Sequence, residues 1–167
     1  LLRRLADPEP TIPDPAVMLR AFASLAAHVM ADPRPALAEQ AKFLAGHLAL
    51  LQAVLRRLGG EDAAPAILPE RGDRRFLDRE WSERIPFDVL KQSYLLASRL
   101  ARDTVSGARG LDPDDARKLA LYVRLAVDAV SPSNFLATNP EALRVARESR
   151  GQSLLRGLEN QIGRAHV

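Results

Sequence analysis

The chain has 167 residues, of which 47% are hydrophobic and 27% charged, with a formal net charge of +3 and no cysteine. This hydrophobic content excludes global disorder, and the lack of cysteine excludes disulfides, cysteine zinc sites and a thiol nucleophile among these residues. The 24 basic residues are interleaved with 21 acidic ones. Because no basic block with interleaved aromatic residues is present, we expect no nucleic-acid partner.

Hydrophobic segments are too short for a membrane protein. Charges interrupt every leucine-rich stretch before it reaches the about 20 apolar residues that a spanning helix needs. The first ten residues also lack the apolar segment and cleavage site of a signal peptide. We therefore expect a cytoplasmic protein without a transmembrane segment, and, since the chain does not begin with methionine, a native N-terminus further upstream.

Four pairs of an acidic or amide residue followed by proline predict helix starts, because the first side chain caps the helix and proline suits its first turn. These pairs are Asp14-Pro15, Asp32-Pro33, Asp112-Pro113 and Asn139-Pro140. No alternating run bounded by turns predicts a strand. The fold class is therefore predicted to be all-α.

Apolar periodicity places the helices in order. The sequence predicts helices over about 15–31, 33–58, 87–106 and 113–130, a fifth from 140 to near 151, and a sixth segment over about 152–160. The first two are separated by a few residues only, so we expect them to pair as an antiparallel hairpin. Residues 59–86 form a long, arginine-rich connection between that hairpin and the later helices.

The helix over 33–58 carries the most regular apolar pattern in the chain. Its members alternate by four and three residues, which is the repeat of about 3.5 residues that is typical of a coiled-coil seam. They are Leu37, Ala41, Leu44, Leu48, Leu51, Leu55 and Leu58. One interpretation is the seam of the intramolecular hairpin; the other is an interface for a second copy or a partner protein, with residues 1–58 as a mobile arm.

The connection over 59–86 contains several prolines and a cluster of arginines and acids. One interpretation of this cluster is a set of weak surface ion pairs. The alternative is that Arg74 and Arg75 bind a carboxylate or phosphate, or fix the loop by bidentate pairing to a buried acid. Phe76 and Trp81 are expected to anchor the loop on the helices. If Trp81 is buried, its truncation to alanine should cost about 3–5 kcal/mol.

Two further segments supply candidate structural residues. Tyr94 lies on the apolar face of the helix over 87–106. In the segment 131–144, Ser131, Ser133 and Asn134 are expected to bond to nearby backbone, and Phe135 is expected to insert into the core. The apolar run at 66–68 is expected to lie extended on a neighbouring element.

No catalytic apparatus is visible in the sequence. The nucleophile-elbow, dinucleotide and phosphate-loop patterns are missing. His28 and His47 each stand alone on a helix, which favours a helix-face histidine over a metal ligand or base. We therefore predict no catalytic, cofactor-binding or metal-binding residue. The last residues, Ile162–Val167, match a translated sequencing adapter and are expected to be non-native, so His166 carries no functional argument.

From about Ile12 to Asn160 the order of motifs resembles the N-terminal region of polyhydroxyalkanoate (poly-beta-hydroxybutyrate) synthases, the bacterial polyester polymerases. The resemblance rests on Pro13-Asp14-Pro15, Gly72-Asp73-Arg74-Arg75-Phe76 with Trp81, Phe87-Asp88, Lys91-Gln92-Ser93-Tyr94-Leu95-Leu96, Asp128-Ala129, the segment from Ser131 to Glu141, and Gly157-Leu158-Glu159-Asn160. The string from Lys91 to Leu96 is more similar to the class I enzymes, which polymerise short-chain 3-hydroxyacyl-CoA, than to the medium-chain class.

The resemblance implies an acyltransferase whose α/β-hydrolase domain, with a cysteine nucleophile aided by histidine and aspartate, would follow this chain. None of those three residues has a counterpart here, so the chain alone is expected to be inactive, and 3-hydroxyacyl-CoA would be met only through the absent domain. The resemblance further implies roles in self-association, stability and location at the polyester granule surface, with granule-associated proteins as partners. The residues expected to serve structure or interaction are Arg74, Arg75, Phe76, Trp81, Tyr94, Asn134, Phe135, Leu44, Leu48, Leu51 and Leu55.

The predicted organisation is an N-terminal helical domain over 1–110, a helical lead-in to the catalytic domain over 111–160, and the tail over 161–167. Two hypotheses follow: a piece of a polyester synthase, and a stand-alone helical interaction module. A piece should expose apolar residues such as Leu143, Leu154, Leu155 and Leu158, whereas a complete module should bury them.

Overall fold

The computed structural model describes residues 15–108 and 110–149, and all regular structure in this part of the chain is helical. The elements are α1 (Pro15–Ala31), α2 (Arg34–Leu58), α3 (Glu80–Glu83), α4 (Ile85–Gly107), α5 (Pro113–Ala129), the 3-10 helix η1 (Pro132–Asn134) and α6 (Pro140–Glu148). The predicted all-α class is confirmed. The short α3 and η1 have too few residues to produce a periodic pattern, and the sequence did not predict them.

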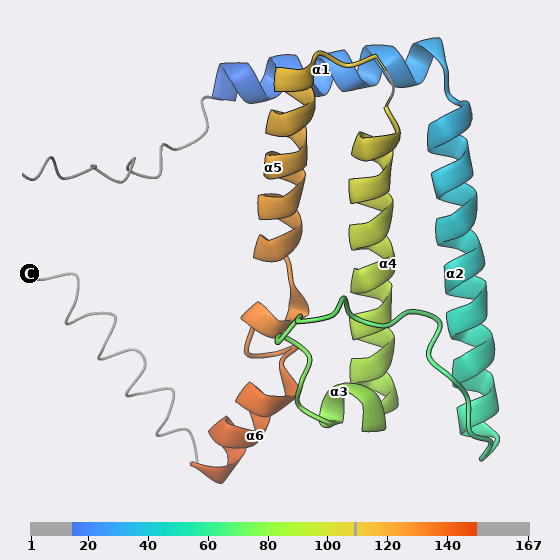
Figure 1. Cartoon of the computed structure of the whole chain (residues 1–167). Coiled ribbons are helices and arrows are strands. Elements are labelled where there is room, and N and C mark those ends of the chain that lie inside the picture. The colour runs from blue at the N-terminus through green and yellow to red at the C-terminus, as the bar shows by residue number, and fades with distance from the viewer. Residues whose placement is uncertain (1–14, 109, 150–167) are drawn as a thin grey trace, which may run out of the picture.

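Three long helices, α2, α4 and α5, stand side by side, with α4 in the middle and antiparallel to both neighbours (Figure 1). Helix α1 lies across one end of this layer, whereas α3, η1 and α6 gather at the other end (Figure 1). The connection between α2 and α3 returns across α4. None of the described helices combines the length and hydrophobicity that a bilayer span requires.

The predicted hairpin of the first two helices is wrong. Helix α2 packs along α4, and α1 turns away from α2 to pack mainly on α5 (Figure 1). The reason lies in the face that α1 buries: Ala21 is fully buried with Val105 of α4 and Leu119 of α5. A small residue at this contact lets the crossing helix approach closely.

Helix α2 contacts α4 through a second apolar face, distinct from the leucine repeat. Leu50 is buried, and Phe43 and Val54 pack against the same cluster. At Gly46 the two helices come so close that a Cβ atom would lie 2.5 Å from Cδ2 of Leu96. The helix pair is therefore defined by one glycine and a few flanking apolar side chains.

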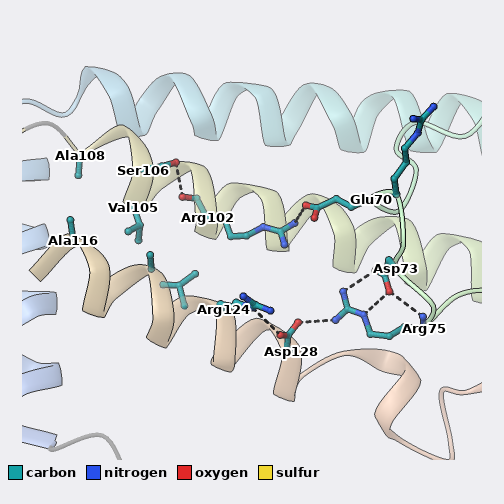
Figure 2. Close-up of a pocket in the computed structure, with 13 residues that line it drawn as sticks. Glu70, Asp73, Arg75, Arg102, Val105, Ser106, Ala108, Ala116, Arg124 and Asp128 are labelled. Atoms are coloured by element: carbon teal, nitrogen blue, oxygen red, sulfur yellow. Dashed lines mark hydrogen bonds and ion pairs between the residues drawn. The ribbon is translucent and has the colours of Figure 1, made fainter. Parts of the chain in front are cut away.

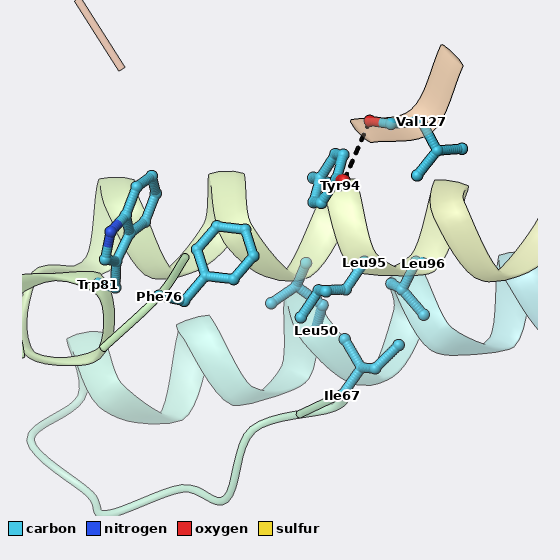
Figure 3. Close-up of a cluster of buried hydrophobic side chains, with 8 residues drawn as sticks. All are labelled: Leu50, Ile67, Phe76, Trp81, Tyr94, Leu95, Leu96 and Val127. Atoms are coloured by element: carbon cyan, nitrogen blue, oxygen red, sulfur yellow. Dashed lines mark hydrogen bonds between the residues drawn. The ribbon is translucent and has the colours of Figure 1, made fainter. Parts of the chain in front are cut away.

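The main core surrounds α4 and includes residues from the long connection (Figure 3). Its buried members are Leu50, Ile67, Phe76, Trp81, Tyr94, Leu95, Leu96 and Val127. Ile67 is buried as expected for the apolar run at 66–68, although Leu68 is exposed. The connection therefore functions as a packed element.

Capping explains two of the predicted helix starts directly. Asp112 accepts hydrogen bonds from the backbone N–H groups of Asp114 and Asp115, and Asn139 accepts them from Glu141 and Ala142. Asp32 accepts one from the N–H of Arg34 at 3.2 Å. The pair Asp14-Pro15 lies partly outside the described residues, as does the whole predicted segment over 152–160 with Leu154, Leu155 and Leu158.

Candidate functional site

Arg75 is the polar centre of the connection. Its guanidinium donates to both carboxylate oxygens of Asp73 at 2.9 Å, to the hydroxyl of Tyr94 at 2.8 Å and to Asp128 at 3.0 Å. Tyr94 donates in turn to the carbonyl oxygen of Val127 at 3.0 Å (Figure 3). Bidentate pairing of this kind fixes orientation as well as distance. Arg75 therefore ties the connection to α4 and α5.

The charge of Arg75 also sets the titration of its neighbour. The side chain of Asp73 is mostly buried. The hydrogen bond from Arg75 holds the pKa of Asp73 below its ordinary value of 3.8, against the opposing effect of burial. Asp73 also raises the pKa of Arg75, so both groups stay charged. Arg74, the other arginine singled out in the sequence, is exposed and has no ion-pair partner within the described residues.

A buried polar network joins α2, the connection and α4. Asp88 accepts from Arg57 of α2 at 2.6 Å and from Gln92 at 2.9 Å, and pairs with Lys91 at 3.0 Å. The amide oxygen of Gln92 accepts from the backbone N–H groups of Ala66 and Ile67. Asp88, Lys91 and Gln92 are all buried, and burying polar groups without partners would be unfavourable. The hydrogen bonds and ion pairs among them offset this cost.

Phe76 and Trp81 lie where packing anchors would be expected. Their rings meet edge to face with centroids 5.0 Å apart, and Phe76 lies 5.9 Å from Tyr94 (Figure 3). The guanidinium carbon of Arg75 lies 5.6 Å from the centre of the Phe76 ring. Trp81 is 1% exposed, so it presents no stacking surface to a ligand.

The segment after α5 is a closed turn, but Phe135 does not enter the core as expected. Asn134 donates to the carbonyl oxygen of Asp128 at 2.8 Å, and Thr138 donates to that of Pro132 at 2.7 Å. Ser131 is fully buried, whereas Phe135 is 52% exposed. The side-chain bonds that close this turn leave Phe135 on its outside. Leu143, expected to be exposed in a piece of a larger protein, is half-buried.

The leucine repeat of α2 is exposed on the surface. Its six leucines are between 54% and 68% exposed, among them the predicted interaction residues Leu44, Leu48, Leu51 and Leu55. The intramolecular interpretation of this repeat is therefore wrong: the seam has no partner among the described residues. This set of six leucines is called the leucine stripe below.

A groove of about 730 Å³ lies between α4, α5 and the connection (Figure 2). One part is lined by small apolar side chains, including Val105, Ala108 and Ala116, and the other by charged groups such as Arg102 and Arg124 (Figure 2). Neither arginine was singled out in the sequence, because nothing in the spacing of two arginines on different helices indicates that they share one groove.

Metal binding has no support in the described residues, which contain no group of three or more histidines and acids placed to hold an ion. The ring nitrogens of His28 lie 2.8 and 3.0 Å from the carbonyl oxygens of Ser24 and Gly110. Nδ1 of His47 lies 3.1 Å from the carbonyl oxygen of Phe43. Both histidines are thus engaged with backbone.

Comparison with known proteins assigns the chain to a family. The chain is 39% identical over 142 residues to a poly(3-hydroxyalkanoate) polymerase of Methylorubrum extorquens. This alignment covers 85% of the present chain and 24% of the relative. It is 32% identical over 142 residues to the PhaC subunit of the corresponding polymerase of Rhizobium meliloti, covering 85% and 23%. The PhaC subunit of Cupriavidus necator is 39% identical over 90 residues, covering 54% and 15%.

The chain thus spans about a quarter of the length of the first two relatives. No solved structure matches it. Residues 72–164, which begin at the Arg75 loop and include α4, α5 and α6, match the family described as the N-terminus of poly-beta-hydroxybutyrate polymerase (PhaC). The chain therefore belongs to the poly-beta-hydroxybutyrate polymerase N-terminal family.

Proposed function

We propose that the chain is the N-terminal helical region of an acyltransferase that polymerises 3-hydroxyacyl-CoA into a polyester, with poly-3-hydroxybutyrate as the expected product. The match of residues 72–164 to the polymerase N-terminus carries this proposal. The described residues supply packing and ion pairing, and we assign them no catalytic step. The chemistry belongs to a domain that would follow this region.

Two measurements test this assignment. The purified chain is incubated with 3-hydroxybutyryl-CoA, and release of CoA is followed; no release is expected. The encoding DNA is then sequenced beyond codon 160, where we expect strands and a cysteine nucleophile motif. Release of CoA by the chain alone would contradict the assignment of chemistry to a following domain. A stop codon directly after Val167 in genomic DNA would contradict the synthase assignment and favour a stand-alone interaction module.

For the region itself we propose a role in assembly, carried by the leucine stripe. A contiguous exposed apolar surface of this kind is unusual on a monomeric protein and marks an interaction site. The stripe precedes the family-model match over residues 72–164, whereas the 142-residue alignments with the first two relatives are long enough to include it. We propose that its partner is the same helix of a second copy.

Two properties of the stripe support self-association. Its repeat of about 3.5 residues is the geometry that lets two helices pair along their whole length. The positions that flank a coiled-coil seam carry no charge here, and they are occupied by Ala38, Gln40, Ala45, His47, Gln52 and Val54. Two copies would therefore meet without the like-charge repulsion that disfavours identical partners.

Sizing tests this role. Light scattering on the purified chain should give a dimer or higher assembly, and Leu48→Lys with Leu51→Lys should convert it to a monomer because two charges would then be buried in the seam. Ala49→Lys serves as the control, since Ala49 is exposed and belongs neither to the stripe nor to the positions that flank it. An assembly that survives the leucine substitutions, or a parent chain that is already monomeric, overturns the proposal.

Location at the granule surface and contact with granule-associated proteins are further parts of the proposed role. An exposed apolar stripe is also suited to a polyester surface. A chain that is monomeric in solution but binds polyester particles through Leu48 and Leu51 would favour this use over self-association.

A further inference from the structure

The groove between α4 and α5 has the chemistry of a ligand site that the assembly role does not use. Its volume of about 730 Å³ lies within the range of small-molecule pockets. Its two parts differ in character: small apolar side chains line one, and arginines and acids line the other (Figure 2). A ligand that fits both parts must itself be amphipathic.

The apolar part is formed by residues of two helices. Val105 comes from α4 and Ala108 directly follows that helix, whereas Ala116, Ala120 and Val123 come from α5 at successive turns. These side chains are short, so space remains between the helices. An aliphatic chain lying there would cover apolar surface of Ala116 and Ala120 that is otherwise in contact with water, which is favourable.

In the charged part, Arg102 and Arg124 face the groove from α4 and α5 (Figure 2). Among the residues that the structure describes, Arg102 pairs with Glu70 alone; the Glu70 side chain is 75% exposed, and such surface pairs contribute little. Arg124 is 3.9 Å from Asp128, too far for a hydrogen bond. Both guanidinium groups therefore have donors that a ligand could use.

Two acids of the groove, Asp73 and Asp128, already accept hydrogen bonds from an arginine. Asp73 binds Arg75 through both of its oxygens, and Asp128 accepts from Arg75 at 3.0 Å. Both carboxylates are thus engaged by one guanidinium group, which also donates to the Tyr94 hydroxyl. Glu70, the third acid of the lining, pairs with Arg102. The four arginines of the lining outnumber its three acids, and this favours an anion.

We propose that this groove binds an aliphatic chain that ends in an anionic group, with the chain between Ala116, Ala120 and Val105 and the anion between Arg102 and Arg124. A carboxylate and a phosphate share the chemistry that the two guanidinium groups recognise. This inference is independent of the proposed assembly role.

Calorimetric titration of the 167-residue chain with octanoate tests the site. Octanol provides the same chain without charge, acetate provides the charge without the chain, and octyl phosphate distinguishes phosphate from carboxylate. We expect octanoate or octyl phosphate to bind more tightly than octanol and acetate. Binding should weaken as salt is added, because the recognised charge pair is close to solvent.

Substitutions locate the binding. Arg102→Gln and Arg124→Gln should each weaken binding of the anion by about tenfold or more. Arg117→Gln on α5 is the matched control, because Arg117 is exposed and lies outside the groove. Trp81 fluorescence checks that each variant remains folded. If a variant does not fold, the parent chain is used instead. The methyl chemical shifts of Val105 and Val123 should then change when octanoate is added, which would place the ligand in the groove.

Three outcomes overturn the proposal. Octanol binding as tightly as octanoate would show that the arginines contribute nothing. Unchanged affinity in both arginine variants, or unchanged valine shifts, would place the ligand elsewhere, for example on the leucine stripe. Absence of binding by both anions would leave the groove without a small amphipathic ligand, as expected if it serves a protein segment instead.

Discussion

Trp81 shows how a single residue can hold a long irregular segment in place. It is almost completely buried and meets Phe76 and Phe87 edge to face, at centroid distances of 5.0 and 5.9 Å. The helix that carries it, α3, has only four residues and would not be stable alone. The side chain therefore stabilises its own element by packing.

Trp81→Ala should lower the free energy of unfolding by about 3–5 kcal/mol, because it removes a large buried ring and leaves a cavity. Urea unfolding followed by far-UV circular dichroism measures this loss. Leu77→Ala, in the same connection but exposed, should change stability by no more than about 0.5 kcal/mol. Equal effects of the two substitutions would show that Trp81 is not an anchor.

At the scale of elements, α2 illustrates the competition between two apolar faces. The leucine stripe is the more regular, yet the face that packs within the chain contains Phe43, Gly46, Leu50 and Val54. Gly46 lets α2 approach Leu96 of α4 more closely than any other residue would permit. The position of this glycine, rather than the number of leucines, selects the packed face.

Gly46→Val should destabilise the fold by about 1–3 kcal/mol, since its side chain would collide with the buried Leu96 and separate α2 from α4. Ala45→Val introduces the same β-branched residue one position earlier on the exposed side and should cost only about 0.5 kcal/mol. Urea midpoints of the two variants and the parent are compared. A Gly46 variant as stable as the Ala45 variant would contradict the close contact.

At the scale of the whole molecule, ion pairs join segments that are distant in the sequence. Arg75 links the connection to Asp128 of α5, and Arg144 links α6 to Asp78 at 2.6 Å and to Glu80 at 3.1 Å. The hydrogen bond from Arg144 lowers the pKa of Asp78, as that from Arg75 lowers the pKa of Asp73. The attachment of the connection to α5 and of α6 to the connection thus depends on ionised carboxylates.

These lowered pKa values predict acid sensitivity. A carboxyl group whose pKa is lower in the folded than in the unfolded state stabilises the fold above the unfolded value of 3.8, and this contribution is lost as pH falls through the folded value. We therefore expect the urea midpoint to fall as pH is lowered from 4 towards 2. Asp73→Asn should lower the midpoint at neutral pH and reduce this dependence on pH.

Asp62→Asn is the matched control for the acid experiment. Asp62 is exposed, and none of the side-chain bonds described above involves its carboxylate. This variant should follow the parent chain across the pH range. An Asp73 variant with the same acid dependence as the parent would show that the Arg75 pair does not couple stability to pH.

Local chemistry by itself determined the helical class and most helix boundaries. Asp112 and Asn139 cap their helices through side-chain bonds to residues two and three positions away, and such short-range signals are readable from the chain. The bidentate Asp73–Arg75 pair is also local and was among the alternatives that the sequence offered. Family membership followed from the same local strings.

Only the tertiary structure decided which helices pair, because that choice depends on contacts between residues far apart in the sequence. Ala21 and Gly46 select the packed faces through their small size, and no periodic pattern records which distant element will use the space. The same long-range arrangement determines three other features: the hydrogen bonds of Gln92 to the connection, the exposure of Phe135, and the presence of Arg102 and Arg124 in one groove. The leucine stripe lies on the surface for this reason. Its pattern predicts that it pairs with another helix, but α2 packs on α4 through its other apolar face.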